Sequence, residues 1–356
     1  MSSPHASSHA APGVSQAVAL QYPFPDLPEA GTVTAVAPGV YWLRMPLPFS
    51  LNHINLWLIE DGEQLAVVDT GIGNDSTRAL WQQFFDSPLG KRGVSRVILT
   101  HHHPDHAGNA QWLAERFGVS VWMSLSEYMV CHAARDTAAG HNTAALLQMY
   151  RANGLSAASE QSMSVRGNYF VTHVPSFAQR YRRLLGGAEL EIGARRWRLI
   201  TGYGHCPEHI SLYCEALGVL ISGDMLLPRI TTNVSVQAYE PEGNPLALFL
   251  DSTARMLSLL ADTLVLPSHG LPFRGAHERA SQLAEHHRLR LAELEAACDA
   301  PRSAADLVPV LFRRELDGHQ MFFAMGESMA HLHYLLAQGR LLRLPPQDGV
   351  LRYVRP

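Results

Sequence analysis

The sequence predicts an α/β (α+β) protein in which a large mixed domain is followed by a small helical one, and three features predict it. Short apolar runs separated by turn residues begin at about Gly31, helical patterns are interleaved with them from about Thr77, and long helical patterns dominate after Gly275. The chain has 356 residues, of which 47% are hydrophobic. It is therefore long enough to bury a sizeable core.

Residues 1–22 are expected to be a flexible lead-in, because they have neither a cationic start nor an unbroken apolar stretch. No secretory signal is predicted, and we expect a cytoplasmic protein. No apolar run approaches the roughly 20 residues that cross a bilayer, so no membrane association is expected. The four cysteines form no CxxC pair and predict no disulfide framework.

The mixed domain, predicted over residues 31–275, opens with strands. VTAVAPGVYWLRM and INLWLIEDGEQLAVVDTG predict a β-rich start, with Asp61-Gly62 as a hairpin turn. Residues 77–85 are expected to be helical, residues 94–100 to be a buried strand and residues 107–117 to be a helix. Strands and helices therefore alternate in this half.

A second series of strands is expected at residues 195–201, 211–224 and 263–270, each leading to a histidine or aspartate beside glycine, proline or serine. Residues 124–185 lie between the two series and contain helix-like pieces, one of which Asn142 is placed to cap. We interpret this segment as a helical insertion or lid.

Residues 276–356 form the predicted C-terminal domain. A long helical pattern comes first, a second helix opens with a Ser303-x-x-Asp306 cap, and a third spans about residues 320–338. RLLRL and VLRYVR then flank PPQDG as the strands of a hairpin would. Three helices followed by a hairpin are a winged-helix-like arrangement.

The charge of this domain argues against nucleic acid as a partner. It contains ten arginines and ten acidic residues, and its third helix has no Lys or Arg, whereas a helix that reads a DNA groove needs cations. The formal net charge of the whole chain is −4. We expect a small-molecule substrate, and a C-terminal domain that packs on the mixed domain or forms a homodimer.

The candidate metal ligands cluster in THHHPDHAGN, residues 100–109, which contains four histidines and an aspartate. His101 and His103 point the same way if the segment is extended, whereas His102 points away and is left out of the site. Asp105 and His106 follow at the mouth of a helix, where they can face a second point. Imidazole and carboxylate groups suit zinc, so one loop could serve two ions, although two ions need more ligands than it has.

The missing ligands are expected from the ends of later strands. His205, Asp224 and His269 each follow an apolar strand. Strand ends converge on one edge of a sheet sandwich, so these residues are expected to meet the histidine loop there.

With these motifs the chain resembles the metallo-β-lactamase superfamily, over roughly residues 31–275. The resemblance rests on Asp69 in VVDTG, on THHHPDH, on His205 in GYGHCPEH, on Asp224 in SGD and on His269 in PSHG. It implies an αββα sandwich with two metal ions along one edge, zinc first, with iron or manganese as alternatives. It implies that His101, His103 and His205 hold one ion, that Asp105, His106 and His269 hold the other, and that Asp224 bridges them.

The resemblance also suggests roles for neighbouring residues. Asp69 is expected to hydrogen-bond metal ligands rather than only to form a turn. His209 lies in a loop and either supports the ligands or packs, and Cys206 is expected to be structural. For His53, Asn55 and Asn233, substrate contact and ordinary hydrogen bonding are equally compatible with the sequence.

The predicted function is metal-dependent hydrolysis. A bridging hydroxide, positioned by Asp105 and Asp224, would attack a small carbonyl substrate such as a thioester, ester or lactone. A phosphodiesterase or ribonuclease with the same metals is the first alternative. An iron-dependent oxygenase or a non-catalytic binding protein is the second.

Overall fold

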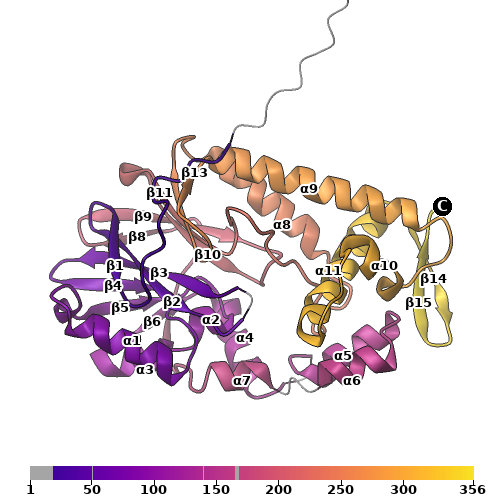
Figure 1. The fold of residues 1–356 in the computed structure, drawn as a ribbon, viewed down its shortest axis with the longest axis horizontal. Helices are drawn as coiled ribbons and strands as arrows, with labels where there is room; N and C mark the ends of the chain where they lie inside the picture. The colour runs from indigo at the N-terminus through magenta and orange to yellow at the C-terminus, as the bar shows by residue number, and fades with distance from the viewer. Residues whose placement is uncertain (1–18, 50, 139, 165–167) are drawn as a thin grey trace, which may run out of the picture.

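The computed structural model describes residues 19–49, 51–138, 140–164 and 168–356, and its central feature is a pair of β-sheets packed face to face between helices (Figure 1). This is the αββα sandwich that the sequence and its resemblance predict. The C-terminal helices and a two-stranded hairpin lie to one side of the sandwich.

The first sheet has seven strands in the order of the sequence. Its first four strands are antiparallel, and β4 to β7 run parallel to one another. The strands are β1 (Val33–Ala37), β2 (Val40–Pro46), β3 (His53–Asp61), β4 (Gln64–Val68), β5 (Val94–Ile98), β6 (Val121–Met123) and β7 (Tyr181–Arg183). The predicted turn at Asp61-Gly62 joins β3 to β4, and Gly62 has a φ of 65° there.

The second sheet has six strands in the order β13-β12-β11-β10-β9-β8. Only β11 and β12 pair in parallel. The strands are β8 (Glu189–Ile192), β9 (Arg195–Gly202), β10 (His209–Cys214), β11 (Val219–Gly223), β12 (Leu264–Pro267) and β13 (Phe273–Arg274). Parallel pairing of β4 with β5 and of β11 with β12 brings the C-terminal ends of these strands to one edge of the sandwich.

Strand β3 is buried on both of its faces, and between Ile54 and Ile59 its residues are apolar except for Asn55. Ile54, Leu56 and Leu58 face outward to the first layer of helices, whereas Trp57 and Ile59 face inward to the second sheet. A strand buried on both faces has no polar side to show, and the alternating pattern of a surface strand is absent.

Helices cover both outer faces of the sandwich. Trp81 and Phe84 of α1 (Asp75–Asp86) and Leu113 of α3 (Ala110–Phe117) pack on the first sheet. Phe249 of α8 (Pro245–Ala254) and Leu283 of α9 (Ala276–Ala297) pack on the second. Each cluster is buried, so the two layers of helices close the core.

The predicted insertion at 124–185 is helical but shorter than expected. It contains α4 (Leu125–Arg135), α5 (Thr143–Ala152), α6 (Ala157–Ser164) and α7 (Tyr169–His173). Asn142 caps α5 as predicted, since its side chain accepts a hydrogen bond from the Ala145 amide at 2.8 Å. The C-terminal end of the segment is not inserted, because β7 pairs with β6 in the first sheet.

The C-terminal region has the predicted order of three helices and a hairpin. After α9 come α10 (Ala304–Leu311), α11 (Gly318–Ala337), β14 (Leu342–Gln347) and β15 (Val350–Val354). Leu332 and Leu335 of α11 share one hydrophobic cluster with Phe249 of the sandwich. The expectation that this region packs on the large domain is therefore confirmed, whereas its likeness to a winged helix stays a prediction.

The predicted lead-in, residues 1–22, falls mostly outside the described residues. The described end of this segment contacts the rest of the protein, which corrects the prediction. Gln21 forms a β-bridge with Arg274, and Leu20 and Tyr22 pack against the hydrophobic cluster between the second sheet and its helices. In the described part of the chain, no helix is long and apolar enough to span a membrane. The cytoplasmic location stays a prediction.

Candidate metal centre

The predicted ligands lie together at the edge where the strands end. Asp69 follows β4 and the histidine loop follows β5, while His205 follows β9. Asp224 and His269 follow the neighbouring strands β11 and β12. The structure thus gathers from five strand ends all seven residues for which the sequence predicted a metal, together with Asp69.

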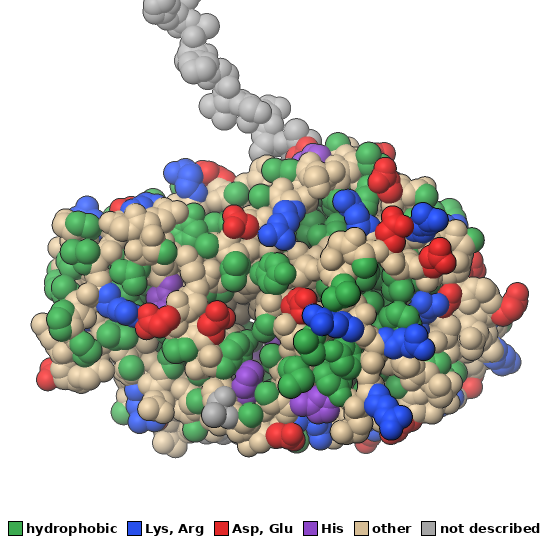
Figure 2. Space-filling model, turned by 180° about the vertical axis from the view of Figure 1, so that it is seen from behind, with side chains coloured by type: hydrophobic (Ala, Val, Ile, Leu, Met, Phe, Trp, Pro, Cys, Tyr) green, Lys and Arg blue, Asp and Glu red, His purple; other side chains and the backbone are tan. Residues whose placement is uncertain are grey.

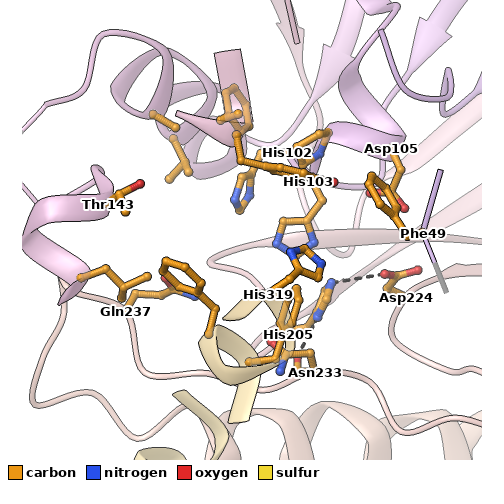
Figure 3. A pocket seen from close by; sticks show the side chains of 18 of the residues that line it. Phe49, His102, His103, Asp105, Thr143, His205, Asp224, Asn233, Gln237 and His319 are labelled. Carbon is orange, nitrogen blue, oxygen red and sulfur yellow. Dashed lines mark hydrogen bonds and ion pairs between the residues drawn. The ribbon is translucent and has the colours of Figure 1, made fainter. Parts of the chain in front are cut away.

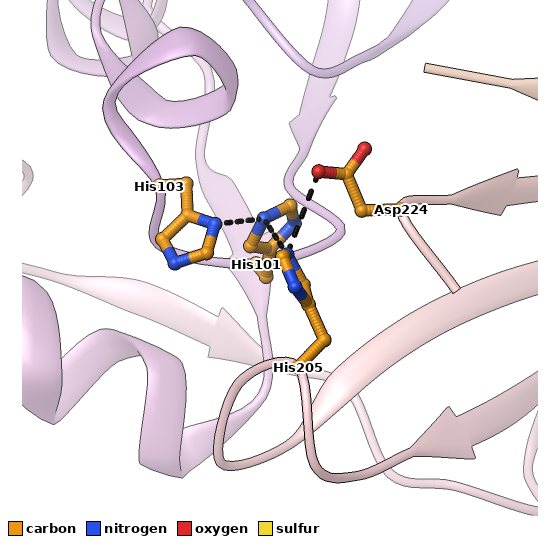
Figure 4. A group of neighbouring side chains, drawn as sticks. All are labelled: His101, His103, His205 and Asp224. Atoms are coloured by element: carbon orange, nitrogen blue, oxygen red, sulfur yellow. Dashed lines mark hydrogen bonds and ion pairs between the residues drawn. The ribbon is translucent and has the colours of Figure 1, made fainter. Parts of the chain in front are cut away.

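One group of potential ligands consists of His101, His103, His205 and Asp224 (Figure 4). His101 Nε2 lies 2.8 Å from His103 Nδ1 and 3.2 Å from His205 Nε2. His205 Nε2 is 3.5 Å from Asp224 Oδ2. Three imidazole nitrogens and a carboxylate oxygen aimed at one point are a donor set that zinc accepts.

The second group consists of Asp105, His106 and His269. Asp105 Oδ2 is 3.7 Å from His106 Nε2 and 3.4 Å from His269 Nε2. All three residues face the same point beside the first group.

Asp224 joins the two groups through its two carboxylate oxygens. Oδ2 faces His205 of the first group, whereas Oδ1 lies 3.6 Å from His106 Nε2 and 3.4 Å from His269 Nε2 in the second. This arrangement places the carboxylate between the two groups, as the predicted bridging role requires.

The protein residues fit divalent metal ions on two grounds. His106 Nε2 and Asp224 Oδ1 are buried and have no hydrogen-bond partner among the described residues, although both point into the centre. Buried polar atoms are normally satisfied, so these two need another partner. Burial, together with the neighbouring histidines, lowers the pKa of His101 and of His103 well below the usual value, so both rings are neutral and can coordinate.

Asp69 orients the histidine loop, as predicted, but it does so through two residues. Its Oδ2 accepts hydrogen bonds at 2.8 Å from His106 Nδ1 and from the Thr100 hydroxyl, and its Oδ1 accepts one from the Thr100 amide. The bond to Nδ1 turns Nε2 of His106 toward the centre. Burial alone would lower the pKa of His106, but Asp69 and then Asp105 and Asp224 raise it well above the usual value.

Replacing Asp69 by asparagine is expected to weaken metal binding about 10- to 100-fold, because an amide cannot accept all three hydrogen bonds. A titration against a chromophoric chelator measures the affinity. Asp86→Asn, on the exposed end of α1, is the matched control. Equal affinity in the two variants would show that Asp69 is only a turn residue.

Two backbone carbonyls orient His205 and His269. His205 Nδ1 donates to the Asn233 carbonyl at 2.7 Å, and His269 Nδ1 donates to the His53 carbonyl at 2.8 Å. In each ring the opposite nitrogen, Nε2, then faces the centre. These bonds fix ring orientation without adding charge.

The three residues considered for substrate contact separate in the structure. Asn233 lines the cavity described below. His53 is not among the residues that line it, and its Nε2 accepts a hydrogen bond from the Gly270 amide at 3.0 Å. This contact is the ordinary hydrogen bonding that the sequence left open for His53, and a role in substrate binding stays a prediction. The Asn55 amide donates to the Pro267 and Gly270 carbonyls, so it holds the loop that carries His269.

His209 holds the backbone of the metal ligand Asp224 in place. It is fully buried, and its Nε2 accepts a hydrogen bond from the Asp224 amide at 3.2 Å. Gly223 is required beside it, because a Cβ at that position would lie 2.2 Å from His209 Nε2. Of the two roles that the sequence left open for His209, the structure favours support of a ligand.

The helix predicted at 107–117 starts only at Ala110, and a separate short helix precedes it. This break positions the histidine loop. The first turn, α2 (Pro104–Ala107), carries Asp105 and His106, and α3 starts only at Ala110. A Cβ at Gly108 would lie 2.3 Å from the Gly73 backbone nitrogen, so a close approach of the two loops requires glycine.

Glu127 was missed by the sequence reasoning. It is fully buried, and its Oε2 accepts a hydrogen bond from the His102 amide at 2.9 Å and lies 2.5 Å from His102 Nδ1. Burial alone would raise the pKa of Glu127, but its contacts with His102 and with the Glu208 amide lower it to about 2. The sequence pattern that could have drawn attention to Glu127 is Ser124-x-x-Glu127, which is a helix-capping pattern at the start of α4.

Cys206 is buried, and burial raises the pKa of its thiol well above the usual value. A protonated thiol is a poor metal ligand, and Cys206 belongs to neither ligand group. The prediction that it is structural agrees with this position.

A cavity of about 880 Å³ opens above the metal centre (Figure 3). His103, Asp105 and Asp224 form part of its floor, and His102 also lines it, although the sequence left His102 out of the site. Its walls come from the loop before β3, from α4, α5 and α7, from the loop after β11 and from α11. Both the inserted helices and the C-terminal region therefore shape the space in front of the metal centre.

Comparison with known proteins agrees with this geometry. The family described as Metallo-beta-lactamase superfamily matches residues 50–269, and the Metallo-beta-lactamase-like C-terminal domain matches residues 291–356. Probable metallo-hydrolase YqjP of Bacillus subtilis is 26% identical over 305 residues, which are 83% of this chain and 92% of that protein.

Two solved structures cover nearly the whole molecule. A beta-lactamase domain protein from Burkholderia ambifaria is 51% identical, with a TM-score of 0.88 over 95% of this chain and 98% of that one. A metallo-beta-lactamase family protein from Thermus thermophilus is 31% identical, with a TM-score of 0.77 over 90% of this chain and 100% of that one. The chain therefore belongs to the metallo-β-lactamase superfamily and is a metal-dependent hydrolase.

Proposed function

We propose that the protein is a dinuclear zinc hydrolase of small, uncharged carbonyl compounds, with a thioester, ester or lactone as the reacting group. The proposal rests above all on the cavity above the metal centre, because none of the described residues that line it is Lys or Arg. Such a lining offers no cationic side chain to a charged substituent that lies away from the metal ions, which are the only cations proposed for the site.

A phosphodiester substrate fits this lining poorly. Recognition of RNA needs several Lys or Arg side chains along the phosphate backbone. On the face shown in Figure 2, basic and acidic side chains are intermixed instead of gathered into a field of one sign. The third C-terminal helix, α11, is largely buried and carries no Lys or Arg, so it is not available for a nucleic-acid groove.

The chain's own residues hold the reacting groups in place. Bound divalent ions supply Lewis acidity, which polarises a carbonyl and makes water acidic enough to react near neutral pH. Asp105 lies on the cavity floor with part of its side chain exposed, so its carboxylate can take a proton from the attacking water. Asp224 keeps the two ligand groups together, and Asn233 faces the substrate from the wall.

Zinc is the metal proposed, because its geometry and its preference for imidazole suit both ligand groups. Five imidazoles and two carboxylates make up the two groups. Iron or manganese would be held by the same donors, so the metal is identified by analysis of the purified protein.

Two partial relatives support the thioester among the three bonds. The human acyl-coenzyme A thioesterase MBLAC2 is 30% identical over 113 residues, 25% of this chain and 39% of that protein. An atrochrysone carboxyl ACP thioesterase of Passalora fulva is 35% identical over 86 residues. The bond that each name describes is a thioester, and we extend that bond type to this chain.

The test is a substrate panel with metal analysis. The zinc-loaded protein is expected to hydrolyse acyl thioesters, aryl esters or lactones, and to leave single-stranded RNA and bis(p-nitrophenyl) phosphate intact. Cleavage of RNA with inert carbonyl substrates would reverse the proposal. A purified protein that holds one iron and no zinc, and that is inert toward the whole panel, would favour the oxygenase or binding alternative.

A further inference from the structure

We propose that Gln237 and Tyr239 form a hydrogen-bonding subsite of the cavity, and that this subsite recognises an amide group of the substrate that lies away from the reacting carbonyl. The inference rests on the proposed function and names a further chemical group of the same substrate. It follows from where the two side chains lie, from the hydrogen bonds that they leave unmade, and from the contacts that hold their segment in place.

The segment after β11 presents polar side chains to the cavity and apolar ones to the core. Asn233, Gln237 and Tyr239 line the cavity. Val234 and Val236, between them, are fully buried in the hydrophobic cluster beside the second sheet. Burial of the two valines anchors the segment, so its polar side chains are held on the side of the cavity.

Gln237 lies away from the metal centre. Figure 3 shows it on the side of the cavity opposite Asp224. A carbonyl carbon and its immediate substituents occupy only a small part of the cavity volume of about 880 Å³, so a substrate that fills more of it extends toward this side. A group that contacts Gln237 is therefore a substituent of the reacting carbonyl and not the carbonyl itself.

The side-chain amide of Gln237 and the hydroxyl of Tyr239 make no hydrogen bond within the described part of the chain, and both are accessible from the cavity. Burial, and then the nearby Glu127 and Cys206, raise the pKa of Tyr239 above its usual value, so its hydroxyl keeps the proton that it can donate. Polar groups in a site that a ligand closes need partners from that ligand. The substrate is expected to supply them.

The two side chains together match an amide. The Gln237 side chain offers N–H donors and a carbonyl acceptor, and the Tyr239 hydroxyl offers a further donor. A substrate amide presents a carbonyl acceptor and an N–H donor at the same time, so it can satisfy both residues. A methylene chain of the same length would leave the protein groups without partners, which is the basis on which such a site rejects it.

Contacts on two sides hold the subsite in place. The His141 ring, just before α5, stacks on the Tyr239 ring with centroids 4.3 Å apart and planes 15° apart. A Cβ at Gly140 would lie 2.8 Å from the Tyr239 Cα, so the two loops approach closely there. On the other side, the Val236 amide donates to the Gly326 carbonyl of α11 at 3.2 Å. A subsite that is already ordered loses less entropy when it binds a ligand.

The experiment compares thioesters that differ only in an amide, with the zinc-loaded protein. One pair has the amide in the thiol arm, S-acetyl-N-acetylcysteamine against S-pentyl thioacetate. The other pair has it in the acyl group, the S-ethyl thioester of N-acetyl-β-alanine against S-ethyl hexanethioate. In at least one pair the amide compound is expected to have a kcat/KM at least about threefold higher than that of its alkane analogue.

Tyr239→Phe removes only the hydroxyl, and Gln237→Met removes the amide at nearly constant shape. Each is expected to lower the amide-to-alkane ratio of kcat/KM by about three- to tenfold in the pair that the wild-type protein discriminates. Tyr181→Phe is the matched control, because Tyr181 also stacks on another ring, that of Tyr128, but does not line the cavity. It should keep the wild-type ratio, and thermal unfolding checks that every variant is folded.

A wild-type protein that hydrolyses the alkane member of both pairs as well as the amide member, or better, would overturn this inference while leaving hydrolysis itself intact. A preference for the amide that Tyr239→Phe and Gln237→Met both keep at the value of Tyr181→Phe would also overturn it. Inactivity toward every thioester, ester and lactone contradicts the proposed function first.

Discussion

Replacing Asp224 by alanine should lower kcat/KM by about 10³-fold or more, with the fold preserved. The two oxygens of this carboxylate face different ligand groups, so its loss removes a donor from both. Several kcal/mol of stabilisation of developing charge depend on correctly held metal ions, and each 1.36 kcal/mol corresponds to a factor of ten in rate. The metal content should fall below the wild-type value in the same protein, as elemental analysis would show.

Asp251→Ala provides the matched control, since Asp251 is an exposed aspartate on α8. This variant should keep wild-type activity and metal content. Circular dichroism and the unfolding midpoint of Asp224→Ala test whether the loss is local. Wild-type turnover in Asp224→Ala would rule out a role for this carboxylate in joining the two groups.

The two ligand groups should respond differently to pH when metal is added to metal-free protein. Burial alone would lower the pKa of His269, but the Asp224 and Asp105 carboxylates raise it to about 10, and the pKa of His106 is also raised well above the usual value. Both rings are then protonated at neutral pH, and a metal ion must displace their protons. The affinity of the group formed by Asp105, His106 and His269 should rise with pH between about 6 and 8, by about tenfold per unit for each proton displaced.

His101 and His103 provide the internal comparison, because burial and the neighbouring histidines lower the pKa of each well below the usual value. These two rings are already neutral at about pH 6, so they release no protons on binding. The group that contains them should fill first at low pH. Calorimetry in buffers of different ionisation heat measures the protons released at each step, and equal release at both steps would contradict the assignment.

Many strand ends and helix starts could be predicted from local sequence patterns. The alternation of apolar runs with glycine, proline and aspartate marks the strand ends, because turns need residues with special backbone freedom or side-chain acceptors. Ser303-x-x-Asp306 predicted the start of α10, where both hydrogen bonds of the capping box are present. Such signals depend on neighbours a few residues apart, which is why a sequence alone carries them.

The helix after the histidine loop was predicted less well. Apolar periodicity suggested one helix over 107–117, but Gly108 and Asn109 separate α2 from α3. The Asn109 amide donates to the Ile72 carbonyl at 2.7 Å, a contact with a loop 37 positions away. A break set by a distant loop has no local signal.

The sequence by itself determined which side chains could bind metal, because His101, His103, Asp105 and His106 lie within one short loop and His269 follows an apolar strand. The position of Asp224 between two ligand groups, which the family resemblance implied, is a matter of tertiary packing, and only the tertiary structure decided that Glu127 holds His102 and that α11 walls the cavity. Ligand type is a property of single residues, and their spacing survives in the chain. A shared carboxylate, a buried hydrogen bond and a cavity wall depend on how segments about 25 to more than 200 positions apart pack together, and no local pattern encodes that packing.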